Sequence, residues 1–179
     1  VSLFASILYR RTLLLNNDIT FSPDRAADDS YFVSCAWFTA HSVAYVDKPF
    51  YNYLIRPGSV CTTRQSDKYL KRIGSFNRLM GYAKQHNIYN DYKQEVDFLY
   101  IKKGYIGSIF NYVVNSLSPQ KQGFNEIYKN LVEQIPDYKE NIYLQQKWGL
   151  RIFMAIIRIC PKSISWLIRW YASYKKMMI

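Results

Sequence analysis

Apolar side chains recur at helical spacing through most of the chain after Arg64, and this periodicity restricts the fold more than any other feature. Residues three and four apart lie on one face of a helix, so such a stripe predicts a helix with one buried side. Pro136 and Pro161 end two of these stretches, because proline cannot continue a helix. The sequence therefore predicts about five helices, at 66–86, 92–117, 121–135, 146–160 and 162–178.

The first 64 residues have a mixed pattern. We expect a short helix at 4–15 and a second one from Asp28 to about His41. Alternating side chains predict strands at 43–47 and 50–55. The predicted fold is therefore α+β and mainly helical, with a short β hairpin or pair of strands in a domain at 1–64 and a helical extension at 65–179.

Charge is distributed unevenly along the chain. The net charge of +11 favours an anionic partner, and residues 145–179 contain seven Lys or Arg and no Asp or Glu. Trp, Tyr and cationic residues alternate in this basic, amphipathic segment, which is typical of peripheral membrane contact. No uncharged apolar stretch reaches the ~18 residues of a membrane-spanning helix. Packing on the rest of the protein, or on a second copy in a homo-oligomer, explains the same pattern equally well.

The cysteines and histidines show no metal-ligand spacing. Cys35, Cys61 and Cys160 are far apart and odd in number, so the simplest interpretation is small buried hydrophobes in a reduced cytoplasmic protein. The chain begins at Val1 with neither an initiator Met nor a signal-peptide pattern, and we expect it to be a fragment.

Asp28 and Asp29 are adjacent carboxylates at the start of the second predicted helix. The free N–H groups and the dipole of a helix N-terminus favour charged carboxylates there. An ordinary helix cap has this appearance, and so has a general base at the edge of a catalytic site. The pair alone leaves both interpretations open.

A larger pattern surrounds this pair. Asp28 to Val33 is followed by Tyr45-Val46-Asp47-Lys48-Pro49, then Tyr51-Asn52-Tyr53, then Arg56-Pro57-Gly58-Ser59-Val60. Together with Leu8 to Arg11 and Ile19 to Phe21, this order resembles the C-terminal half of the catalytic domain of family 2 glycosyltransferases, the inverting GT-A enzymes of bacterial surface polysaccharide synthesis. The resemblance covers about residues 3–64.

The resemblance implies roles for particular residues. Asp29 would be the catalytic base and Asp28 its neighbour, although the family has Glu where this chain has Asp28. Arg56, Gly58 and Ser59 would bind the donor phosphates. The substrates would be a nucleotide-sugar donor and a saccharide or lipid-linked acceptor, used in the cytoplasm or at the inner face of the plasma membrane.

The family's N-terminal half is missing from this sequence. That half carries the nucleotide-binding strands and the Asp-x-Asp that holds a divalent metal, Mg or Mn, in the full-length enzyme. This chain contains no Asp-x-Asp, so we expect the fragment to be inactive by itself.

Two other interpretations remain open, and in one of them the chain is the relic of an enzyme in which the pair Asp28-Asp29 is only a helix cap. A non-enzymatic basic helical module could bind nucleic acid or an anionic membrane surface, although acidic residues interrupt the basic stretch at 68–103 and no nucleic-acid motif occurs.

Trp37 and Phe38 could stack on sugar rings, but aromatic residues at helical spacing more often belong to the core, and a core position is our prediction.

Overall fold

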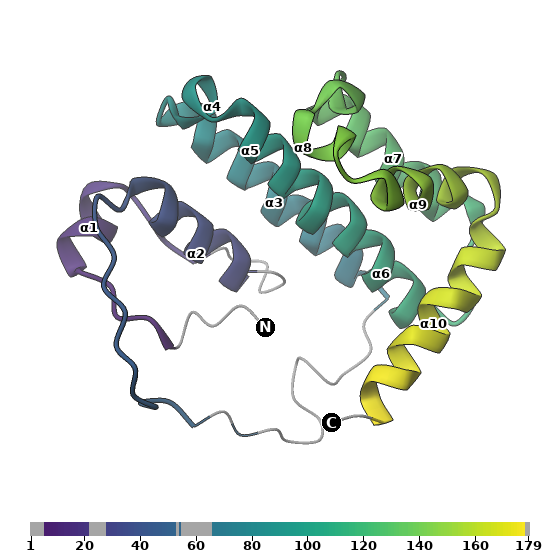
Figure 1. Ribbon diagram of the computed structural model, residues 1–179, viewed down its shortest axis with the longest axis horizontal. Coiled ribbons are helices and arrows are strands. Elements are labelled where there is room, and N and C mark those ends of the chain that lie inside the picture. Colours follow the sequence, from purple (N-terminus) through teal and green to yellow (C-terminus); the bar gives the residue numbers. More distant parts are fainter. Residues whose placement is uncertain (1–5, 22–27, 53, 55–65, 178–179) are drawn as a thin grey trace.

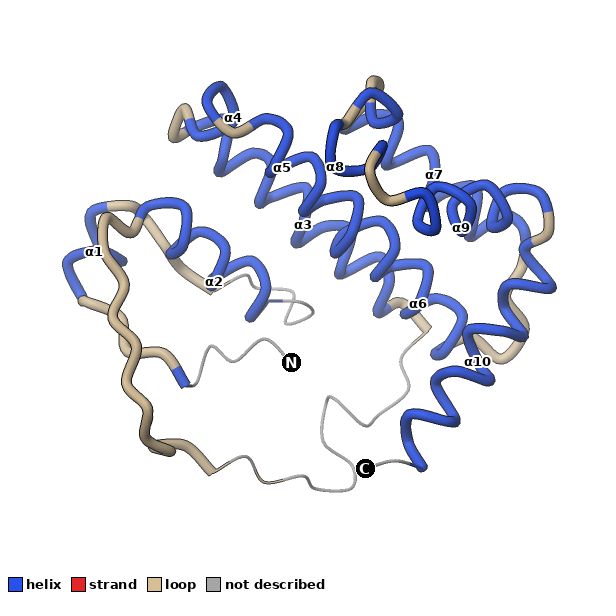
Figure 2. Tube along the Cα trace, in the orientation of Figure 1, coloured by secondary structure: helices blue, strands red, loops and turns tan. Residues whose placement is uncertain are grey.

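The computed structural model describes residues 6–21, 28–52, 54 and 66–177, and in these ranges the chain is helical without strands (Figure 2). The prediction of a mainly helical fold is therefore confirmed. The helices, in chain order (Figure 1), are α1 (Arg11–Asn16), α2 (Asp28–Thr39), α3 (Lys68–Gln85), α4 (Ile88–Asp91), α5 (Lys93–Leu99), the π-helical segment η2 (Tyr100–Tyr105), α6 (Ile106–Asn115), α7 (Lys121–Gln134), the 3₁₀ turn η3 (Tyr138–Glu140), α8 (Ile142–Gln145), α9 (Trp148–Ile159) and α10 (Pro161–Met177).

A pair of long helices forms the centre of the molecule. α3 lies beside the nearly continuous rod of α5, η2 and α6, and the short α4 connects them (Figure 1). Phe76 of α3 is fully buried against this rod. A Cβ on Gly104 would lie 3.1 Å from Phe76 side-chain atoms, so the glycine allows η2 to approach α3 closely.

The C-terminal helices cover one side of this pair. Ile127 and Leu131 of α7, Leu144 of α8 and Ile157 of α9 are all buried in the common core. α10 packs on α6, and Arg169 donates hydrogen bonds to the carbonyl oxygens of Ser116 and Leu117, at 2.7 and 2.9 Å. This cation therefore satisfies carbonyl groups at the C-terminal end of α6.

The N-terminal helices lie on the other side of the central pair (Figure 1). α2 packs on α3 through Phe32, Cys35 and Ala36, which are buried at helical spacing. The hydroxyl of Tyr82 in α3 donates to the carbonyl oxygen of Asn17, at 3.0 Å, and so connects α3 to the end of α1. The domain division near residue 64 falls outside the described residues and stays a prediction.

The strand prediction is wrong for the described parts of 43–47 and 50–55. Residues 42–52 run as an irregular segment, and each of them is exposed (Figure 2). A strand is stabilised by hydrogen bonds to a neighbouring strand, and the described chain supplies none. The first helix is also shorter than expected, because α1 begins only at Arg11.

Candidate functional site

The aspartate pair lies in the first turn of α2, as predicted. The helix begins at Asp28, and Asp29 is partly buried. Backbone N–H groups in a first helical turn have no intrahelical acceptor, and the helix dipole adds positive potential there. Asp29 therefore lies where the free N–H groups and the dipole of α2 attract an anion, and its side chain stays partly accessible.

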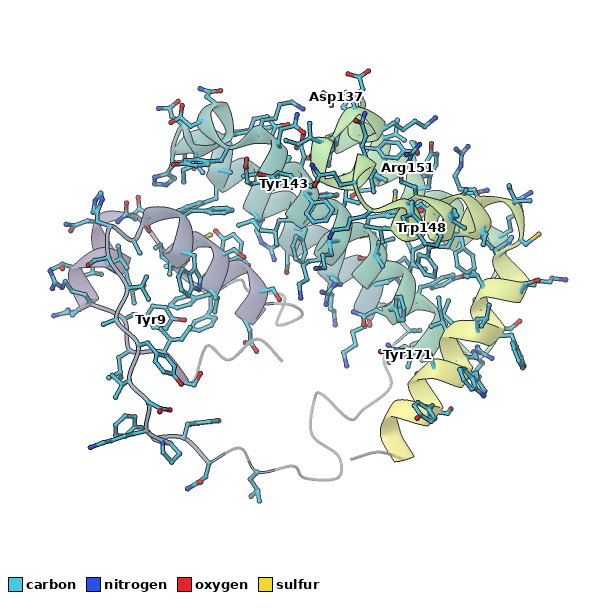
Figure 3. The ribbon with its side chains drawn as sticks, viewed as in Figure 1. Tyr9, Asp137, Tyr143, Trp148, Arg151 and Tyr171 are labelled. Carbon is cyan, nitrogen blue, oxygen red and sulfur yellow. The ribbon has the colours of Figure 1, made fainter. Side chains whose placement is uncertain are left out.

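Tyr9, labelled in Figure 3, packs on α2, and the sequence did not indicate it. Its ring meets Phe32 edge to face, with 5.1 Å between centroids, and Phe21 stacks on the same Phe32 at 4.3 Å. Burial, and then the charge of Asp29, raise the pKa of Tyr9. Its hydroxyl is buried and has no hydrogen-bond partner among the described residues, so it is a donor without an acceptor there.

The segment after α2 carries a row of uncovered aromatic rings. Tyr45 is 87% exposed and Phe50 is 78% exposed, and Tyr51 is exposed as well. The Tyr45 hydroxyl donates to Oδ1 of Asp47 at 3.2 Å. Large apolar side chains in this state form a surface that a partner or a further part of a fold can cover.

Other predicted residues have different outcomes. Arg56, Gly58 and Ser59, the expected phosphate-binding residues, lie outside the described residues. The core prediction for Trp37 is wrong, because this ring is 55% exposed, on the face of α2 that turns away from Phe32, whereas Phe38 is partly buried as expected. Trp37 is the exposed position within 29–39, and the other residues of this range are partly or fully buried.

No metal site can be built from the described residues. Among them, no three His, Cys, Asp or Glu side chains come together as a ligand set. Within the same ranges, every helix falls short of the length and hydrophobicity that a bilayer crossing requires.

Thus the described candidate groups are a partly buried carboxylate, a tyrosine hydroxyl without a hydrogen-bond partner among the described residues, and the exposed aromatic residues of the segment that follows α2. These groups can accept a proton, donate a hydrogen bond and contact a sugar ring. Comparison of the chain with protein-family models, curated proteins and solved structures gave no match.

Proposed function

We propose that this chain is the C-terminal part of an inverting glycosyltransferase that uses a nucleotide-sugar donor and a saccharide or lipid-linked acceptor. The order of the motifs between Leu8 and Val60 supports this proposal. The observation that carries it is the position of Asp29, which is partly buried in the first turn of α2 and whose charge acts on Tyr9.

Asp29 is the proposed general base. In an inverting transfer, the acceptor hydroxyl oxygen forms a bond to the anomeric carbon while the bond to the donor diphosphate breaks on the opposite face. The Asp29 carboxylate takes the hydroxyl proton, and the diphosphate leaves with the bonding electron pair. The Tyr9 hydroxyl would donate a hydrogen bond to the acceptor or to the carboxylate, and Arg56 and Ser59 would bind the diphosphate.

The exposed segment at 42–52 has a role in the same proposal. In the complete GT-A domain it would pair with strands from the N-terminal half, which would cover Tyr45 and Phe50. Without those strands the segment has no hydrogen-bonding neighbour, and the chain alone would be inactive. The divalent metal of the complete enzyme would be held by that other half.

The test uses the chain joined to the sequence that precedes it in its gene. Release of nucleoside diphosphate is measured for a panel of nucleotide sugars with oligosaccharide and lipid-linked acceptors. Loss of a general base slows proton transfer about 10²- to 10⁴-fold, so Asp29→Asn should lose at least about a hundredfold in turnover. Asp91→Asn, an exposed acid in α4, is the control and should retain activity. Unchanged turnover in Asp29→Asn contradicts the assignment of the base.

A second function, attachment to an anionic membrane surface, has its own observation. Exposed rings and aliphatic side chains form stripes along α9 and α10: Trp148, Ile152, Ile156 and Ile159 on α9, and Trp166, Leu167, Trp170, Tyr171 and Tyr174 on α10. Trp166 and Trp170 are 67% and 57% exposed, one helical turn apart, and the exposed Lys162 lies one turn before Trp166. Such helices insert rings at the headgroup level while cations meet anionic lipids.

Sedimentation with vesicles tests this function. The double variant Trp166→Ala/Trp170→Ala should lose most of its binding to phosphatidylserine vesicles at low salt, while Trp37→Ala, an equally exposed ring on α2, should bind like the unmodified chain. Salt should weaken binding, because cation–headgroup attraction is screened. Equal binding by the double variant would assign the stripes to protein contacts, including contacts with a second copy.

A further inference from the structure

Two adjoining cavities, of about 400 and 550 Å³, lie between α7 and α9. Both are lined by Tyr105, Tyr128, Ala155 and Arg158, so they meet at one set of side chains. Figure 1 shows α2 on the opposite side of the central helices from α9. The cavities are therefore separate from Asp29 and do not depend on the proposed sugar transfer.

Arg158 lies where the two cavities meet. Its guanidinium carbon is 4.2 Å from the centre of the Tyr128 ring, so the ring holds the planar group in a fixed orientation. The side chain is nevertheless exposed, and no carboxylate in the described ranges forms an ion pair with it. An oriented guanidinium of this kind has donors left for an external anion.

The remaining charges around the cavities have the same sign. Lys121 lines the smaller cavity, and Lys139 and Arg151 line the larger one. Among the described residues that line either cavity, none is acidic. The electrostatic potential therefore favours an anionic ligand.

Tyr105 forms the inner wall of both cavities. It is only 2% exposed, at the last position of the π-helical segment η2, and its hydroxyl has no hydrogen-bond partner in the described structure. A buried hydroxyl without a partner is costly, and π-helical turns are frequent at functional sites. Burial raises the pKa of Tyr105, so the group stays protonated and can act as a donor.

The larger cavity also has an apolar side. Trp148 and Ile152 line it and are 75% and 50% exposed, and Figure 3 shows Trp148 with Arg151 at the start of α9. A ligand that fills this cavity therefore meets both cations and an aromatic and aliphatic surface. Inorganic anions would use only the first of these.

The geometry points to a binding site for a phosphate ester with an apolar substituent. Arg158 pairs with the phosphate oxygens, Tyr105 donates a hydrogen bond to one of them, and the substituent lies against Trp148 and Ile152. The ligand can be a phospholipid or a soluble ester such as an aryl phosphate, because both present this chemistry.

Isothermal titration calorimetry with the full chain tests the site. The probes are dihexanoyl phosphatidic acid below its micelle concentration, phenyl phosphate, inorganic phosphate and dihexanoyl phosphatidylcholine. We expect one of the two esters to bind at least tenfold more tightly than inorganic phosphate and than the phosphatidylcholine. Preference for phosphatidic acid identifies a lipid, and preference for phenyl phosphate identifies a soluble ester. Absence of binding by both esters overturns the inference.

Variants separate ligand contacts from effects on folding. Arg158→Gln should weaken binding of the preferred ester at least tenfold, whereas Lys129→Gln, a cation on α7 outside both cavities, should change it less than twofold. Tyr105→Phe should weaken binding about fivefold while leaving the melting temperature unchanged or higher, because it removes an unpaired buried hydroxyl. Unchanged binding in both Arg158→Gln and Tyr105→Phe would overturn the inference.

Discussion

The ammonium group of Lys93 lies 2.8 Å from Oδ2 of Asp97, a carboxylate whose side chain is only 1% exposed. The same ammonium lies 2.8 Å from Oδ2 of Asp137, and the hydroxyl of Tyr89 donates to Oδ1 of Asp97 at 2.9 Å. One cation thus neutralises a buried acid in α5 and connects it to the loop before η3. This network holds the segment that leads to α8 and α9 against the central helices.

Removal of Lys93 should destabilise the fold strongly. Loss of one partner leaves a buried charge uncompensated, which costs about 3–5 kcal/mol in fully buried pairs. The Lys93 side chain is 38% exposed and Tyr89 stays bonded to Asp97, so we expect about 2–3 kcal/mol for Lys93→Met. The control is Lys129→Met, because Lys129 and Glu133 form an exposed pair at 3.6 Å, and such pairs contribute about 0.5 kcal/mol or less. Urea unfolding measures both values, and equal losses would contradict the network.

The same network predicts how stability depends on acid. The hydrogen bond from Lys93 lowers the pKa of Asp137 below its ordinary value. A group with a lowered folded-state pKa contributes stability above its unfolded-state pKa, about 3.9, and loses this contribution as the pH falls through the folded-state value. We therefore expect the unfolding free energy to fall below about pH 4, and to fall less steeply in Asp137→Asn. If the unfolding free energies of the two proteins fall equally steeply as the pH is lowered, Asp137 does not contribute to the acid dependence of stability.

Much of the helical part of the fold could be predicted from the sequence. The stripe in 66–86 became α3, and Pro136 and Pro161 lie just after α7 and at the first position of α10. The stretch 92–117 forms one rod as expected, but its π-helical segment was not predicted. Periodicity reports which side of a helix is buried, and a single extra residue in one turn changes that pattern too little to be noticed.

The candidate sites were less predictable, for a related reason. Asp29 could be located because a helix start has a local signature. Tyr9 could not, since its position beside Asp29 depends on how the chain before α1 folds back over Phe32. The Arg158 cavity combines residues from η2, α7 and α9, and no local pattern indicates that these side chains meet.

Two glycines in helices should respond oppositely to substitution by alanine. A Cβ on Gly123 would overlap the ring of Tyr112, whose hydroxyl accepts from the backbone N–H of Gln120 at 2.9 Å. Gly123→Ala should therefore displace this ring and cost about 1–3 kcal/mol. Gly81 in α3 has nothing within 4 Å of the added Cβ, so Gly81→Ala should stabilise by about 0.5–1 kcal/mol through helix propensity. Thermal unfolding of both variants measures the difference, and a stabilising Gly123→Ala would contradict the contact with Tyr112.

Thiol reactivity tests whether α2 is docked on α3. Cys35 is fully buried in α2, and burial raises the pKa of its thiol to about 12, whereas Cys160 after α9 is exposed. Because thiolates are the reactive form, a disulfide reagent at pH 8 should modify Cys160 at once and Cys35 only when α2 opens. The measurement uses the Cys61→Ser variant, so that two thiols remain, and adding Cys160→Ser should remove the fast phase. Rapid reaction of both thiols in the native protein would mean that α2 does not stay docked on α3.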